Sequence, residues 1–200
     1  MSNITFKTSG VEVSENTFES PYISYGINEV RISSVDYLES AQNTPGIRFN
    51  FETLEVYPQL DNSPKTTNHV YYLKTEINNK IFIERVILMA NALGIRQELD
   101  SLGEENLSMK DYVSGLNDIF AGKEARIKFK GKEVAGKEGK NNWFKAELSM
   151  DKRFIESIDV PLEQSKLTFD ENNKYDVDKL EKLDTNSPVT NETSSSSGLY

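Results

Sequence analysis

Cationic and aromatic side chains are interleaved between residues 123 and 154, where they could bind an anion and stack on flat rings. This segment holds ten Lys or Arg against five Asp or Glu, a local charge of +5, in a chain whose formal net charge is -9. A polyanion would be attracted to this segment and repelled by the rest of the chain. The distribution of charge is therefore a better guide to binding partners than the net charge. Aromatic rings beside cations add flat surfaces for stacking. The segment predicts a binding surface.

Residue types that could support catalysis are scarce. The chain has no cysteine, which excludes a thiolate nucleophile, a thiolate metal site and a disulfide framework. His69 is the only histidine, and we expect it in a loop without a partner for a metal or a catalytic relay. Residues 131–138 come close to a phosphate-binding P-loop, but Glu138 stands where Ser or Thr must hold magnesium. We expect a protein that is not an enzyme, with no cofactor and no bound metal.

Composition divides the chain into three parts. Residues 1–20 predict a flexible N-terminal arm, and residues 21–160 predict the folded domain. Residues 161–200 predict an acidic, Ser-rich, largely disordered tail, because such a segment cannot bury enough apolar surface to offset its ordering entropy. No apolar run is long enough to cross a bilayer, and the N-terminus lacks the pattern of a signal peptide. The sequence therefore predicts a cytoplasmic protein without membrane association.

Within the predicted domain, hydrophobic residues mostly alternate with a period of two, as a sheet requires. The extended segments span residues 26–38, 47–56, 70–77, 80–83, 125–130 and 142–150. The first of them loses phase at Ser33 and Ser34, which predicts a bulge. Asn78 and Asn79 predict the turn of a hairpin.

Helical spacing replaces this alternation in the middle of the chain. Residues 86–93 place apolar side chains on one stripe, and Gly94 stands where a left-handed cap is expected. A second helix is predicted from Ser108, a capping residue followed at the third position by Asp111, to its end at Gly122. The order of strands and helices predicts a mainly β fold. More specifically, it predicts an OB-fold-like five-stranded barrel with a helical insertion between strands 3 and 4.

The alternation assigns faces to the last two strands. If Ile127 and Phe129 pack in the core, the cations between and beside them face outward. If Phe144 packs in the core, Trp143 faces outward as a base-stacking platform. The candidate nucleic-acid-binding residues are Arg48, Tyr72, Lys74, Arg126, Lys128, Lys130, Lys132, Lys137, Lys140, Trp143 and Lys145. On this interpretation, replacing Trp143 and Lys128 by Ala weakens strand binding and leaves the thermal midpoint nearly unchanged.

Residues 20–160 resemble the phage single-stranded DNA-binding proteins of OB-fold type, particularly those of the crAss-like group. The resemblance rests on residues 26–32 (GINEVRI), 44–47 (TPGI) and 120–133. It implies non-specific binding of single-stranded DNA through a basic, aromatic-containing groove during phage DNA replication or recombination in the host cytoplasm. It also implies that the acidic tail recruits replication or recombination proteins.

Other interpretations stay open. The alternating lysines could be ordinary solvated strand faces, Trp143 could pack in the core, and the acidic tail could serve only to solubilise the chain. The chain could also be a non-catalytic structural or interaction protein of the virion, or a carbohydrate-binding OB module. Steep loss of affinity with salt would distinguish a binder of nucleic-acid backbone from these classes.

Overall fold

The computed structural model describes residues 20–57, 63–138 and 140–180. The predicted N-terminal arm, except for Ser20, and the last part of the predicted tail, residues 181–200, lie outside the described residues. The described strands are β1 (Gly26–Glu39), β2 (Pro45–Tyr57), β3 (Ser63–Tyr72), β4 (Glu124–Val134), β5 (Trp143–Leu148), β6 (Ile155–Ser157) and β7 (Val177–Asp178). The described helices are α1 (Glu76–Ala92), α2 (Arg96–Gly103) and α3 (Met109–Phe120), with a 3-10 turn at Leu162–Gln164.

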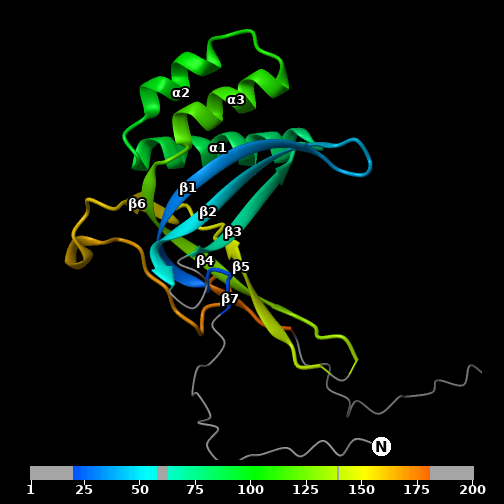
Figure 1. The fold of residues 1–200 in the computed structure, drawn as a ribbon, viewed down its shortest axis with the longest axis vertical. Coiled ribbons are helices and arrows are strands. Elements are labelled where there is room, and N and C mark those ends of the chain that lie inside the picture. The colour runs from blue at the N-terminus through cyan, green and yellow to red at the C-terminus, as the bar shows by residue number, and fades with distance from the viewer. Residues whose placement is uncertain (1–19, 58–62, 139, 181–200) are drawn as a thin grey trace, which may run out of the picture.

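The strands form one sheet in the order β3-β2-β1-β4-β5, and β6 and β7 both pair with β4. All of these ladders are antiparallel except the short one between β4 and β7. The three helices gather at one end of the sheet, and the β4–β5 hairpin extends from the other end (Figure 1). The prediction of a mainly β fold with helices between the third and fourth strands is confirmed.

The sheet is open. Strands β3 and β5 are its two edges, and no hydrogen-bonded ladder joins them in the part of the chain that the structure describes. The two edges nevertheless contact each other. This approach leaves a gap between two strand edges, and the candidate site lies there.

Aromatic side chains connect the sheet with the helices in the core. Phe49 on β2 contacts Phe120 on α3 edge to face, with ring centroids 5.7 Å apart. Phe51 makes the same kind of contact with Phe129 on β4, also at 5.7 Å. All four rings are fully buried. Edge-to-face pairs of this kind add stability beyond the area that they bury.

Several local predictions are confirmed. The register of β1 against β2 shifts between Ile32 and Ser34, where a bulge was expected from the lost phase. The Ser108 hydroxyl caps α3 by accepting the Asp111 N–H at 3.2 Å. Gly94 follows α1 with φ +69°, a conformation that L side chains rarely adopt.

Two local predictions are wrong. Asn78 and Asn79 form no hairpin turn but lie in the first turn of α1, where the Thr75 hydroxyl accepts the N–H of Asn78 at 3.2 Å. Helical spacing wins there because it buries one stripe of α1, including Phe82, in the core. His69 lies within β3, not in a loop, because β3 begins at residue 63 and pairs with β2 along most of its length.

No helix among the described residues is long and apolar enough to span a membrane.

Candidate functional site

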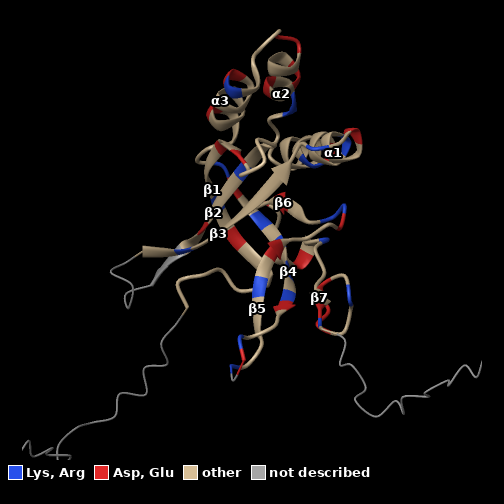
Figure 2. Cartoon of the chain, turned by 90° about the vertical axis from the view of Figure 1, so that its right-hand side faces the viewer, with Lys and Arg blue, Asp and Glu red and all other residues tan. Residues whose placement is uncertain are grey.

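The C-terminal segment 149–178, here called the strap, covers the row of cations on β4. The row consists of Arg126, Lys128 and Lys130, and Figure 2 shows acidic residues of the strap beside it. Phe154, Leu167 and Val177 anchor the strap with buried side chains. The strap also adds β6 and β7 to β4. Part of the segment predicted to be a tail is therefore packed on the domain.

Arg126 lies under the strap with only 4% of its surface exposed. Its Nη1 is 2.6 Å from the Glu156 carboxylate, and its Nη2 is 2.8 Å from Glu29 on β1. It also donates a hydrogen bond to the carbonyl oxygen of Val160. The predicted exposure of Arg126 is wrong because an acid on each side neutralises the guanidinium in place.

Lys128 is buried more deeply, with 2% exposed. Its ammonium lies 2.9 Å from Asp151 and 3.0 Å from Asp176. Burial alone would lower the pKa of Lys128, but hydrogen bonds and attraction from the two carboxylates hold that pKa above its ordinary value. The predicted exposure of Lys128 is also wrong. Lys130 is partly buried and pairs with Asp178 at 3.2 Å.

Exposed cations remain on the β4–β5 hairpin. Lys132, Lys137, Lys140 and Lys145 are all exposed there. Lys132 and Lys145 stand directly opposite each other across the two strands. Like charges in this position destabilise a sheet, although Glu147, 3.4 Å from Lys145, offsets part of the repulsion. An anion bound between the two ammonium groups would relieve the rest.

Trp143 is at the start of β5 with 53% of its surface exposed. Of the two interpretations of its position, the structure shows the exposed one. Its neighbour Phe144, expected in the core, is 38% exposed and contacts the ring of Tyr25 at a centroid distance of 5.3 Å. Ala146 and Leu148 further along β5 are buried. The period of two thus holds over the inner part of β5 and weakens at the hairpin.

The remaining predicted site residues lie elsewhere. Tyr72 and Lys74 are exposed where β3 leads into α1, at the helical end of the sheet. Arg48 on the neighbouring β2 forms an ion pair with Asp36 at 2.9 Å. The structure does not bring these three residues together with the hairpin.

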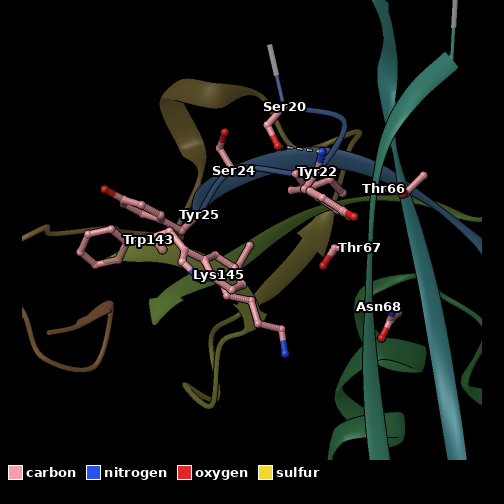
Figure 3. Close-up of a pocket in the computed structure, with 12 residues that line it drawn as sticks. Ser20, Tyr22, Ser24, Tyr25, Thr66, Thr67, Asn68, Trp143 and Lys145 are labelled. Atoms are coloured by element: carbon pink, nitrogen blue, oxygen red, sulfur yellow. Dashed lines mark hydrogen bonds between the residues drawn. The ribbon is translucent and has the colours of Figure 1, made fainter. Parts of the chain in front are cut away.

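A groove of about 550 Å³ lies between the two edges of the sheet (Figure 3). Its lining comes from Ser20, Tyr22, Ile23, Ser24, Tyr25, Thr66, Thr67, Asn68, Trp143, Phe144, Lys145 and Ala146. Tyr22 is held against β3 because the Ile23 N–H donates to the carbonyl oxygen of Thr66 at 3.2 Å. Tyr22 is 69% exposed, so the groove presents the rings of Tyr22 and Trp143 from different walls.

The ring of Tyr25 lines the groove. It packs against Phe144 and, at 6.0 Å between centroids, against Phe169 of the strap. Gly131 on β4 is required here, since a Cβ at that position would lie 2.8 Å from the Tyr25 ring. Sequence reasoning missed the β3 wall and the Tyr22–Tyr25 segment. The only available signal was the aromatic pair itself, because no extended segment was predicted between residues 56 and 70.

His69 gives the fold a pH dependence. It lies on β3 next to the groove, and burial lowers its pKa from 6.5 to about 4, with Glu147 opposing the shift. Between these values the unfolded chain binds more protons, so stability present above pH 6.5 is lost as the pH falls. We expect this histidine to contribute a loss of about 1 to 2 kcal/mol in the free energy of unfolding between pH 7 and pH 5.

Urea unfolding of the wild type and of His69→Gln at both pH values measures this contribution. The wild type should lose more stability than the variant as the pH falls. Equal losses would show that His69 is as easily protonated in the folded chain as in the unfolded one.

Comparison with known proteins adds no assignment. No family model matches the chain, and no curated protein matches it. Among residues 20–57, 63–138 and 140–180, no group of three His, Asp or Glu side chains is arranged to hold a metal ion. A proposal about function therefore rests on the geometry of the groove and the hairpin.

Proposed function

We propose that the chain binds single-stranded DNA non-specifically, with bases in the groove between β3 and β5 and phosphates on the lysines of the β4–β5 hairpin. The observation that carries the proposal is the exposed Trp143 at the groove, two residues along β5 from Lys145, which stands opposite Lys132. A ring face for bases beside cations for phosphates is the combination that non-specific single-strand binders use.

The proposal includes an OB-like, partly open barrel. The strand order supports it, because β3 and β5 end the order as the two facing edges and the helices stand between β3 and β4. OB-folds bind oligonucleotides through the face of strands 2 and 3 and through the loops that follow strands 1 and 4. The loop after β4 carries Lys137 and Lys140, which fits this mode of binding.

The resemblance to phage single-stranded DNA-binding proteins of OB-fold type is part of the same proposal. With it come a role in DNA replication or recombination, action in the host cytoplasm and recruitment of partner proteins by the acidic C-terminal residues. The strap limits which acidic residues could recruit partner proteins. Its acids at 151, 156, 176 and 178 are engaged with β4, so these four carboxylates are not available to a partner protein.

Salt dependence tests the proposal. Log K for a dT oligonucleotide should fall linearly with log salt, by about 0.7 for each phosphate neutralised, and thus with a slope of about -3 if all four hairpin lysines contact phosphates. A gel-shift series at several salt concentrations measures this slope, with a duplex of equal length as the control. The duplex should bind more weakly, since its bases cannot enter the groove. Absence of any shift of the oligonucleotide at low salt would remove the proposal.

A carbohydrate is the second candidate ligand, and one wall of the groove favours it. Thr66, Thr67 and Asn68 offer hydroxyl and amide groups opposite aromatic rings, without a charged side chain on that wall. Rings with neutral hydrogen-bonding groups are suited to sugars as well as bases. A carbohydrate ligand would bind with little dependence on salt, so the same titration separates the two candidates.

A further inference from the structure

We infer that the strap forms a second anion site, which binds phosphoryl groups, in a pocket beside β6. The pocket has a volume of about 420 Å³, and its lining includes three cations, Lys152, Arg153 and Lys166. The first two precede β6 and the third follows the 3-10 turn, so two separate segments bring them to one place. All three side chains are exposed.

The carboxylates next to these cations are already engaged. Glu156 lines the same pocket, but its Oε1 accepts from Arg126 at 2.6 Å and from the Ser165 hydroxyl at 2.5 Å. Its Oε2 accepts the backbone N–H of Lys166 at 3.2 Å. Asp151 pairs with the buried Lys128. Within the described chain, the side chains of Lys152, Arg153 and Lys166 form no ion pair.

The three cations around this pocket form no ion pair with the described residues, although Arg153 is attracted to Asp151, and an anion between them would lower their mutual repulsion. A phosphoryl group suits the set, because a guanidinium can bind two of its oxygens and two ammonium groups can approach the others. Gln164 supplies a neutral donor at the same pocket. Ile155, Val160 and Leu167 add apolar surface to the lining, in which Glu156 is the one acidic residue that the structure describes.

The position of the pocket indicates where the phosphate would come from. Strands β5 and β6 follow one another along the same edge of β4, opposite residues 129–134 and 125–127. A strand bound along β5 would therefore continue toward β6 and this pocket. This assignment of the phosphate to bound DNA rests on the function proposed above, whereas the anion site itself does not.

The test uses the full chain and a triple variant, Lys152→Gln, Arg153→Gln and Lys166→Gln. A charge-matched control replaces three exposed lysines at the helical end, Lys80, Lys110 and Lys123, by Gln. For a dT oligonucleotide, the salt slope of the pocket variant should be smaller in magnitude by about 2, from three contacts, and that of the control unchanged. For inorganic triphosphate, measured by calorimetry at low salt, the pocket variant should lose at least about tenfold in affinity, as removing charge-assisted contacts predicts.

Each result decides one question. Triphosphate binding that the pocket variant loses, without oligonucleotide binding by the wild type, supports the anion site and removes the proposed function. Oligonucleotide binding with the same salt slope in wild type and pocket variant, and unchanged triphosphate affinity, overturns the anion site and leaves the function standing. If the triple variant does not fold, Lys166→Gln alone should reduce the slope by about 0.7.

Discussion

Replacement of Asp176 by Ala is expected to lower the free energy of unfolding by about 3 kcal/mol, the lower end of the range for breaking a buried ion pair. Asp176 is buried, lies 3.0 Å from the Lys128 ammonium and also accepts the backbone N–H of Asp170 at 3.0 Å. Without it, Lys128 stays buried with Asp151 as its one remaining carboxylate. Because Asp151 still pairs with Lys128, the loss in the free energy of unfolding should stay below the upper end of the range for breaking a buried ion pair.

Urea unfolding at neutral pH measures this loss, and Asp178→Ala is the matched control. Asp178 belongs to the same strap and pairs with Lys130, but half of its side chain is exposed. An exposed pair contributes at most about 1 kcal/mol, so the control should change little. Similar small losses for both variants would mean that the strap does not seal Lys128 from water.

Replacement of Trp143 by Ala is expected to weaken binding of a dT oligonucleotide by about 1 to 3 kcal/mol, or roughly 5- to 150-fold in Kd. The indole is exposed beside the groove, so removing it deletes a stacking surface while the core stays filled. The free energy of unfolding should therefore change by no more than about 0.5 kcal/mol, as for other surface substitutions. Titration of a fluorescently labelled dT oligonucleotide measures Kd, and urea unfolding measures the free energy of unfolding.

Trp143→Phe should keep most of the affinity, because a smaller ring still offers a face to a base. Tyr175→Ala is the control for a general effect of aromatic surface, since Tyr175 is also exposed but lies on the strap outside the groove. Its affinity should equal that of the wild type. A Trp143→Ala variant with wild-type affinity would exclude the groove as the base site.

The structure separates two substitutions that the strand alternation had grouped. By its pattern, Lys128 looked as expendable for stability as Trp143. In the structure, Lys128→Ala would leave Asp176 buried without its cation, and we therefore expect it to destabilise the fold as Asp176→Ala does. Weaker DNA binding by a Lys128 variant would therefore reflect unfolding as much as a lost contact between Lys128 and DNA.

Features that depend on neighbours in sequence were predictable from the sequence alone. The strand around Ile127 and Phe129, the cap at Ser108 and the glycine after α1 are set by interactions within a few residues, and all three are confirmed, although the outward exposure expected for Arg126 and Lys128 is not. The mainly β class and the place of the helices followed from the same local patterns. The start and end of β3 were not predictable in this way, because its proline and its polar residues gain strand pairing only against β2.

Only the tertiary structure decided what covers each face. Alternation shows that Arg126 and Lys128 share a face, but it cannot show that Glu156 and Asp176 of the strap neutralise them there. The groove likewise needs two sheet edges to approach, and no residue pattern within either strand encodes that distance. Ion pairing and edge approach are set by contacts between distant parts of the chain, whereas period and capping are set by adjacent ones.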